Sequence, residues 1–272
     1  MFNSKKKLIV SGCSYTDDRY EFPVWPTVLG KKLDMEVINL AESGCGNEYI
    51  YSTLLDRVIE EKNIGLVVVM WSEFNRIDFE TPHPPNNKTK IKTDGWRSIH
   101  TIRNNFYTFD GYPVSKQNYW KDEVSNLFNK YKYSEPKYRT RKSLRRFYSL
   151  QKILESLDIE YLQIVGTKPD WGDDAHHCSK EILANEYTNL IDEKTFIGWP
   201  IFKKIGGFTI DHYLDEIDPT CLSNRIDGRR MIPQFNRGPR YDSHPNKLGH
   251  EQMADLLYNQ YVENTHEEKN TR

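Results

Sequence analysis

The stretch Gly65-Leu66-Val67-Val68-Val69-Met70-Trp71 decides the fold of this chain. It is an unbroken apolar run, and short runs rich in β-branched residues are typical of strands that are buried on both faces of a parallel sheet. Two earlier segments, Lys7 to Gly12 and Glu36 to Leu40, are of the same type. The sequence therefore predicts a parallel sheet that helices cover on both faces.

Helical patterns separate and follow these strands. Pro26 to Leu33 begins with a proline, which suits a first helical turn, and Asn47 to Lys62 carries its apolar residues on one face. The order strand, helix, strand, helix, strand predicts a doubly wound sheet with right-handed crossovers. Further along, we expect a helix over Ser143 to Leu157, a fourth strand over Glu160 to Val165, and a last helix over Asn246 to Tyr261.

Two long segments interrupt this order, at about 77–142 and 166–240. The second contains a helical pattern at Ser179 to Leu190. At 272 residues, the chain has the length of one α/β domain with insertions. We predict a single domain over 1–265 with a disordered tail at 266–272. Its fold would be a three-layer α/β/α arrangement with a flavodoxin-like parallel sheet, and the insertions would form a cap over the strand ends.

Charge and composition limit the partners. The net charge is −1, which gives no electrostatic reason to expect nucleic acid or an anionic membrane. The segment Lys137 to Arg146 is locally basic and is either the solvated start of a helix or an anion-binding patch. The apolar run after Lys7 is too short for a signal peptide, and no run is long enough to span a membrane.

The cysteines indicate a compartment. Their spacing fits neither a disulfide framework nor a metal site, so free thiols in a reducing environment are expected; they are Cys13, Cys45, Cys178 and Cys221. We therefore expect a cytoplasmic protein, which for a phage-encoded chain means the host cytoplasm or the virion.

Three polar motifs follow predicted elements at one edge of the sheet, where open parallel sheets bind ligands. The first is Gly12-Cys13-Ser14-Tyr15-Thr16. A serine in a turn between strand and helix can project its hydroxyl into the crevice, with backbone N–H groups aimed at a developing oxyanion. The alternative is ordinary turn and capping chemistry.

The second motif is Asn39-Leu40-Ala41-Glu42-Ser43-Gly44-Cys45-Gly46-Asn47. Its glycines allow a tight turn and leave N–H donors open, while Asn47 can cap the following helix or donate its amide to a substrate oxygen. A turn followed by a helix cap would also explain this sequence.

The third motif is Asp242-Ser243-His244-Pro245-Asn246. Pro245 stiffens the chain after His244, and Asp242 lies close enough in sequence to orient the imidazole. His250, one turn into the last helix, is expected on its solvated face.

Together these motifs resemble the SGNH (GDSL-like) hydrolase superfamily, in particular its divergent bacteriophage members. The resemblance covers residues 7–76, 143–165 and 241–261. It implies that Ser14 is the nucleophile, His244 the general base and Asp242 the acid that holds the imidazole. It further implies an oxyanion hole formed by the N–H groups of Ser14 and Gly44, with a side-chain amide from the third block.

The chain departs from the family pattern in three places. Cys13 replaces the usual aspartate before the nucleophile, and Asp242 precedes His244 by two residues where the family has three. In the third block, Trp71-Ser72-Glu73-Phe74-Asn75-Arg76, Glu73 stands where the family places its oxyanion-hole asparagine. Because a carboxylate opposes an oxyanion, we expect Asn75 or Asn47 to supply the donor. Loss of one such donor typically costs about 100- to 1000-fold in rate.

Two further groups of residues have the composition of a binding site. Asp173-Asp174-Ala175-His176-His177-Cys178 contains metal-ligand types, but we expect it on an irregular loop and predict neither metal nor cofactor. Aromatic residues are frequent in the insertions and would stack on sugars, meet a protein partner or build small local cores. They include Trp96, Tyr107, Tyr112, Tyr119, Trp120, Tyr131, Tyr133, Trp171 and Trp199.

The sequence thus predicts a serine esterase that forms an acyl-serine intermediate on a small-molecule or carbohydrate ester, with an acetylated polysaccharide as the preferred substrate. Transfer of the acyl group to another hydroxyl would use the same residues. The alternative is a catalytically inactive binding or structural module of the same fold, such as a virion protein.

Overall fold

The structure is a computed structural model. It describes residues 5–80, 96–102, 105–107, 124, 126–128, 130–133, 135–169, 172–217, 230–233, 239–242 and 244–271. No helix in these ranges is both long and apolar enough to cross a membrane.

The centre of the fold is a parallel sheet of five strands in the order β2-β1-β3-β7-β8. If only the strands of this sheet are counted along the chain, their spatial order is 2-1-3-4-5, which is the flavodoxin-like order. The strands are β1 (Lys7–Gly12), β2 (Glu36–Asn39), β3 (Ile64–Trp71), β7 (Tyr161–Val165) and β8 (Phe196–Ile197).

Alternation along β3 divides the core into two layers. Val67, Val69 and Trp71 belong to one buried cluster, whereas Leu66, Val68 and Met70 belong to the other. Successive side chains of a strand point to opposite faces, and here both faces are apolar. The unbroken apolar run thus serves two cores at once, as its sequence predicts.

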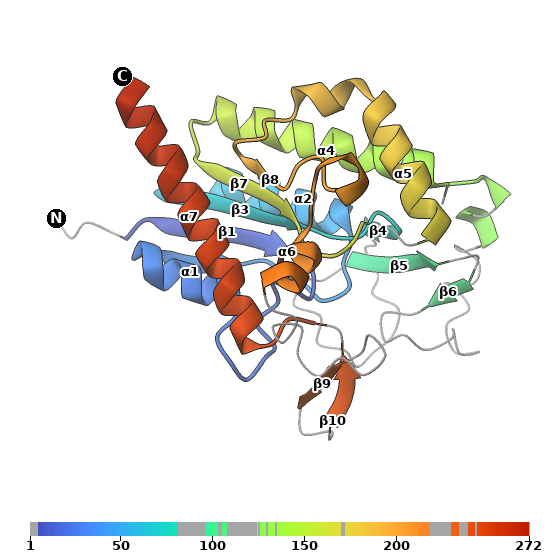
Figure 1. The fold of residues 1–272 in the computed structure, drawn as a ribbon, viewed down its shortest axis with the longest axis horizontal. Coiled ribbons are helices and arrows are strands. Elements are labelled where there is room, and N and C mark those ends of the chain that lie inside the picture. Colours follow the sequence, from blue (N-terminus) through green and yellow to red (C-terminus); the bar gives the residue numbers. More distant parts are fainter. Residues whose placement is uncertain are drawn as a thin grey trace.

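Helices cover both faces of the sheet (Figure 1). One face packs against α2 (Asn47–Glu60), α4 (Pro136–Ser156) and α5 (Gly172–Ala184), and the other packs against α1 (Trp25–Leu33), α6 (Ile210–Ile217) and α7 (Lys247–Thr271). The three-layer α/β/α fold predicted from the sequence is therefore confirmed.

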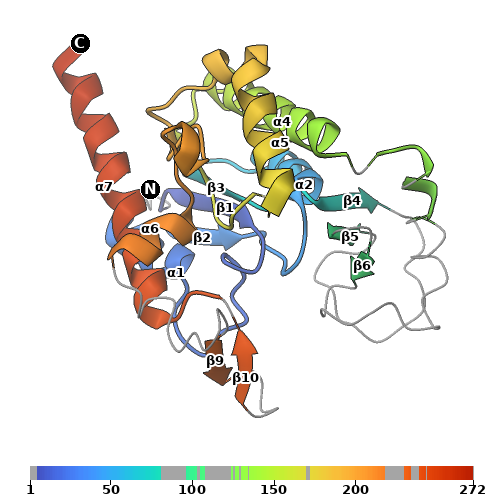
Figure 2. The same cartoon turned by 45° about the vertical axis from the view of Figure 1, so that its right-hand side comes forward.

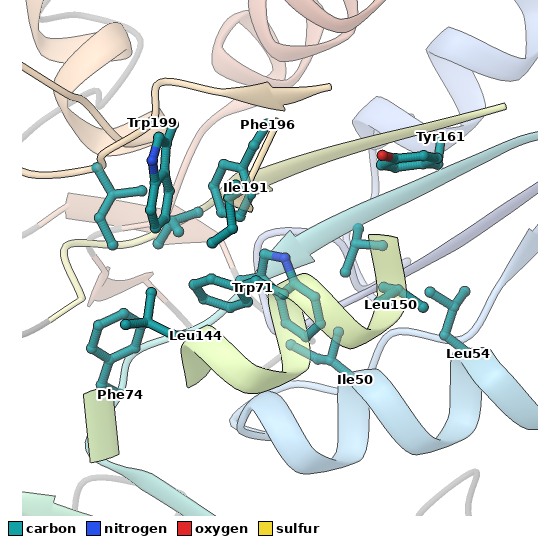
Figure 3. Packing of buried hydrophobic residues seen from close by; sticks show 14 of the residues in the cluster. Ile50, Leu54, Trp71, Phe74, Leu144, Leu150, Tyr161, Ile191, Phe196 and Trp199 are labelled. Atoms are coloured by element: carbon teal, nitrogen blue, oxygen red, sulfur yellow. The ribbon is translucent and has the colours of Figure 1, made fainter. Parts of the chain in front are cut away.

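Aromatic rings fill the core under α2 and α4. Figure 3 shows Trp71 of β3 between these helices, near Ile50 and Leu150. The Trp71 and Phe147 ring centroids lie 4.7 Å apart, and the Trp71 indole N–H donates to Gln163 Oε1 at 2.9 Å. A buried indole N–H without an acceptor is costly, and the bond to Gln163 provides that acceptor. The same bond fixes the orientation of the Trp71 ring.

Two small antiparallel sheets lie outside this core. One contains β4 (Arg76–Glu80), β5 (Trp96–Ile102) and β6 (Asn105–Tyr107), and both views place it on the side away from α7 (Figures 1 and 2). The other pairs β9 (Arg230–Pro233) with β10 (Pro239–Asp242), directly before the turn that carries His244. The first sheet falls almost wholly within the first predicted insertion, whereas β10 extends two residues beyond the second, as far as Asp242.

The second insertion is not wholly outside the fold, contrary to prediction. Phe196 and Ile197 form β8, which pairs with β7, and Leu214 of α6 is fully buried against the sheet. A strand of two residues carries no recognisable alternation, so the pattern of the sequence could not reveal it.

Three local predictions were also wrong. The predicted helix at Ser179 to Leu190 is the end of α5 followed by a separate 3₁₀ turn at Glu186–Leu190, whose N-cap is Asn185. The acidic and histidine-rich segment at 173–178 is helical as part of α5. The tail predicted to be disordered continues α7 as far as Thr271, and Asn264 anchors this end by donating to the Lys194 carbonyl.

Candidate active site

Ser14 lies in a tight turn at the carboxyl end of β1. The backbone N–H groups of Thr16 and Asp17 both donate to the Cys13 carbonyl, at 2.9 and 3.1 Å. A side chain on Gly12 would collide with Thr16, so only glycine allows this close turn. Ser14 retains 8% of its accessible surface, which leaves its hydroxyl at the edge of the protein interior.

The loop after β2 is tied to this turn. Glu42 N–H donates to the Gly12 carbonyl at 3.2 Å, Asn39 Nδ2 donates to the Thr16 carbonyl at 2.7 Å, and Ser43 donates through its N–H and its hydroxyl to Asp17 Oδ2. The first and second sequence motifs therefore form one hydrogen-bonded unit, as the sheet order requires.

Gly44 occupies the turn of this second loop. Its φ of +77° lies in the left-handed region, and the turn closes with Cys45 N–H on the Glu42 carbonyl at 3.3 Å. An L-residue at this position would be strained, which accounts for the glycine. The neighbouring Cys45 is fully buried, and burial raises the pKa of its thiol well above the ordinary value, so it remains a protonated packing residue.

His244 comes from the opposite end of the chain. It follows β10 and precedes α7, and its Nε2 atom lies 2.6 Å from Ser14 Oγ. For the serine hydroxyl to donate across this distance, the imidazole must be neutral with its hydrogen on Nδ1. Sequence reasoning paired these two residues across 230 positions, and the fold brings them together.

Aromatic side chains surround the imidazole. The Tyr15 ring meets it edge-on at a centroid distance of 5.3 Å, and the Tyr20 ring lies 6.4 Å away. Tyr15 is held in turn, because its hydroxyl donates to Asp211 Oδ1 at 2.8 Å, and Asp211 is itself buried. The ring that contacts His244 is therefore fixed at its far end by a carboxylate from α6.

His250 is not on a solvated face, contrary to prediction. Its side chain is fully buried, and its Nδ1 accepts the backbone N–H of Trp25 at 3.2 Å. The residue before α1, Val24, provides no side-chain cap, so His250 supplies the missing acceptor from α7. This imidazole serves to join two helices.

The third block contains an internal ion pair. Glu73 and Arg76 approach to 3.3 Å with side chains that are 13% and 7% exposed, and Arg76 also donates to the Cys45 carbonyl at 3.1 Å. Burial by itself lowers the pKa of Arg76. Nearby groups, of which the Glu73 carboxylate has the largest effect, outweigh burial and raise the pKa of Arg76 above its ordinary value. The charge expected to oppose an oxyanion is thus balanced by a guanidinium.

Asn47 is committed to the core, which corrects its predicted roles. Its Nδ2 donates to the Ser72 carbonyl at 3.3 Å and to Ser143 Oγ at 3.1 Å, and its Oδ1 accepts the Ser72 N–H at 2.8 Å. Both amide hydrogens are therefore used to join the third block to α4. Nor does Asn47 cap α2, since the N-cap residue is Gly46 and the cap comes from elsewhere.

Asp78 of β4 supplies that cap. Its carboxylate accepts the N–H groups of Gly46, Glu48 and Tyr49 at 2.7 to 3.0 Å, together with the Ser98 hydroxyl. Burial raises the pKa of Asp78, while the hydrogen bonds from Ser98 and the backbone oppose the rise. Sequence reasoning missed this residue because the helix and its cap are separated by more than a strand.

The remaining predicted site residues are less fully defined. Asn75 is buried in the connection between β3 and β4. The backbone of Asp242 forms the last residue of β10, but its side chain is not among the described parts of the structure. Ser243 and Cys221 also lie outside the described residues. In the described ranges, no group of three or more histidine, cysteine, aspartate or glutamate side chains could hold a metal ion. Asp174 instead pairs with Arg139 at 3.1 Å, which assigns part of the basic segment a structural role.

The aromatic residues of the insertions divide between core and surface. Trp199 is packed against Phe196, and Trp96 meets Tyr49 edge-on, so both join the main core under α2 and α4. Tyr131 and Tyr133 are exposed. The side chain of Tyr107, and the residues Tyr112, Tyr119, Trp120 and Trp171, lie outside the described ranges.

Three solved structures are similar to this chain. A protein described as a lipolytic member of the G-D-S-L family from Desulfitobacterium hafniense DCB-2 gives a TM-score of 0.44 at 13% identity, covering 94% of this chain and 99% of that one. The acetyl xylan esterase AlAXEase gives 0.42 at 16% identity, covering 93% and 98%. The acetyl xylan esterase Est2A from the rumen bacterium Butyrivibrio proteoclasticus gives 0.38 at 12% identity, covering 96% and 64%.

No protein-family model matches the sequence, and no curated protein is similar to it.

Proposed function

We propose that this protein is a serine esterase whose nucleophile is Ser14 and whose general base is His244. The observation that carries the proposal is the 2.6 Å separation of Ser14 Oγ and His244 Nε2. This separation lies within the range for a nucleophile and its base.

The reaction follows from this pair. His244 Nε2 takes the hydroxyl proton as Ser14 Oγ attacks the acyl carbon, and the same proton passes to the leaving alcohol. Water then attacks the acyl-serine, with His244 again accepting a proton, and releases the acid. Asp242 is proposed to accept the Nδ1 hydrogen of His244 and so to hold the tautomer that this step needs.

The oxyanion hole is proposed to consist of the N–H groups of Ser14 and Gly44, with Asn75 as the side-chain donor. Support for the first two comes from the hydrogen bonds between their loops, and from the left-handed turn at Gly44. Asn47 is left out because its amide hydrogens are used elsewhere.

The substrate is proposed to be a small acyl ester on a carbohydrate. The exposed ring of Tyr131 is of the kind that stacks on sugar rings, whereas the Tyr133 ring already stacks on Phe128. The carbohydrate is the alcohol part of the ester, and its identity does not change the hydrolytic chemistry.

The competing function is that of a non-catalytic binding module with the same fold. The observation that favours it is the third block, where Glu73 replaces the family's asparagine and Asn47 has structural partners. An enzyme that lost one oxyanion donor would retain activity reduced by about 100- to 1000-fold, whereas a binding module would have none.

Hydrolysis of p-nitrophenyl acetate separates the two. The wild-type protein should turn over the ester, Ser14→Ala should reduce the rate to background, and Ser52→Ala, a matched change on α2, should leave it unaltered. Equal background rates for the wild type and Ser14→Ala, with folding confirmed by circular dichroism, would instead favour the binding module.

A further inference from the structure

A cavity lies beyond the carboxyl end of β7, where Lys168 and Pro169 form part of its wall. Its volume is about 230 Å³, and its lining includes Lys168, Lys203, Lys204 and His212. Cavities for drug-sized ligands usually measure about 300 to 1000 Å³, so this one fits a smaller group such as a single sugar ring.

The cavity is close to Ser14 because two loops share one carboxylate. Asp211 accepts the Tyr15 hydroxyl on Oδ1 at 2.8 Å and the Lys168 N–H on Oδ2 at 3.3 Å. Tyr15 follows Ser14 directly, and β1 and β7 flank β3 in the sheet. Two strand spacings separate the strand ends by about 10 Å. A short oligosaccharide can therefore reach both places at once.

Positive charge dominates the lining. All of its formally charged side chains at neutral pH are lysines, whereas the carboxylates nearest to them, Asp215 and Glu216, do not line the cavity. Lys168 lies 4.0 Å from Asp215, and Lys203 lies 2.5 Å from Glu216, with these side chains between 31% and 66% exposed. Exposed pairs of this kind are weak, so the lysines can turn to an anionic ligand.

His212 adds a neutral hydrogen-bond donor. Burial lowers its pKa to about 4, assisted by the charges of Lys168 and Lys203, so the ring is neutral at pH 7. Its Nδ1 accepts the Thr209 N–H at 3.2 Å, which places the ring hydrogen on Nε2. The cavity thus contains ammonium and imidazole donors.

The remaining wall suits a sugar ring. Phe202, Pro169 and Ala175 contribute apolar surface to the same cavity. An apolar wall with a few polar donors is the usual composition of a small-ligand site, and a lysine ammonium group donates charge-assisted hydrogen bonds to a carboxylate.

We propose that this cavity binds the carboxylate of an acidic sugar residue, so that the enzyme deacylates an acidic polysaccharide in preference to a neutral one. The preference for an acidic polysaccharide as substrate rests on the proposed esterase function. The binding itself is independent of turnover and can be measured without it.

The test is a titration of the wild-type protein with trigalacturonic acid, which carries no ester, monitored by calorimetry and by ¹⁵N NMR. We expect saturable binding with shifts at the Lys168 and His212 amides, and no binding of the neutral galactose trisaccharide. The double variant Lys203→Gln/Lys204→Gln should weaken binding by at least about tenfold, because each lysine contributes a charge-assisted contact. Lys31→Gln, a lysine change on α1, should bind like the wild type.

Absence of binding, or equal binding of the acidic and neutral trisaccharides, would overturn the proposal. So would inorganic phosphate that binds as tightly as the trisaccharide, because the cavity would then be a site for a free anion. Binding of the acidic sugar by a protein that does not hydrolyse p-nitrophenyl acetate would sustain the cavity and reject the esterase function, so the two failures are distinguishable.

Discussion

Two polar clusters lie beyond the carboxyl ends of neighbouring strands, and they differ in how their side chains are used. After β3, Asn47, Glu73, Arg76 and Asp78 are bound to one another's loops, to backbone N–H groups and to α4. Beyond the end of β1, Ser14 Oγ lies 2.6 Å from His244 Nε2, and Ser14 is 8% exposed. The first cluster stabilises a connection, and the second has the geometry of a reacting pair.

The difference has a physical cause in the first insertion. The sheet formed by β4, β5 and β6 begins only a few residues after β3, and it must be joined to α2. Asp78 and Arg76 make that junction, because one accepts the N-terminal N–H groups of α2 and the other donates to the Cys45 carbonyl. Polar residues that resemble a catalytic block are therefore used for attachment.

The largest effect is expected at His244. Replacement by alanine removes the base from the proposed reaction and should lower kcat/KM for p-nitrophenyl acetate by about 10⁴-fold, with little change in stability. Free imidazole added to His244→Ala should restore part of the rate, and Ser14→Ala should not respond. Rescue of both variants would show that the hydrolysis is not carried out by this pair.

The next effect is expected at Asp78, and it should appear in stability. Asp78→Ala leaves three N–H groups at the start of α2 without their acceptor and should lower the free energy of unfolding by about 2–4 kcal/mol. Urea unfolding measures this. Asp78→Asn keeps an acceptor oxygen and should cost less. If Asp78→Ala unfolded at the same urea concentration as the wild type, this cluster would not have the structural role assigned to it.

A smaller effect is expected at Glu73. Glu73→Gln leaves Arg76 without its charge partner and should lower the free energy of unfolding by about 1–3 kcal/mol, with ester hydrolysis changed less than about threefold. The contrary result, a large rise in kcat with unchanged stability, would show that Glu73 faces the reacting oxygen. The cluster after β3 would then have a part in the reaction and not only a structural role.

The smallest effect concerns pH. His212 has a folded pKa of about 4, below the ordinary value of about 6.5, so its protonation favours the unfolded chain. Stability is complete above about pH 6.5 and falls as the pH drops toward 4, by about 1 kcal/mol after allowance for solvent screening. His212→Asn, which retains an acceptor for Thr209, should show a flatter profile between pH 7 and pH 5 in urea unfolding. Parallel profiles would place the acid sensitivity elsewhere.

The framework was predictable from sequence because it depends on local pattern. β1 and β3 carry continuous apolar runs, and Ser14 and His244 stand in short motifs at strand and helix boundaries. β8 was missed because two residues carry no period. The cap from Asp78 and the buried contact of His250 with Trp25 join segments far apart in the chain, and no local pattern encodes such pairs.

The most direct test of the central claim is covalent labelling with diethyl p-nitrophenyl phosphate, followed by peptide mass spectrometry. The account predicts one phosphorylated site, on the peptide that contains Ser14, with release of one equivalent of p-nitrophenol. Labelling should be lost in Ser14→Ala and slowed strongly in His244→Ala. Phosphorylation of another residue, or equal labelling rates in the wild type and His244→Ala, would contradict the claim that these two residues form an active nucleophile and base.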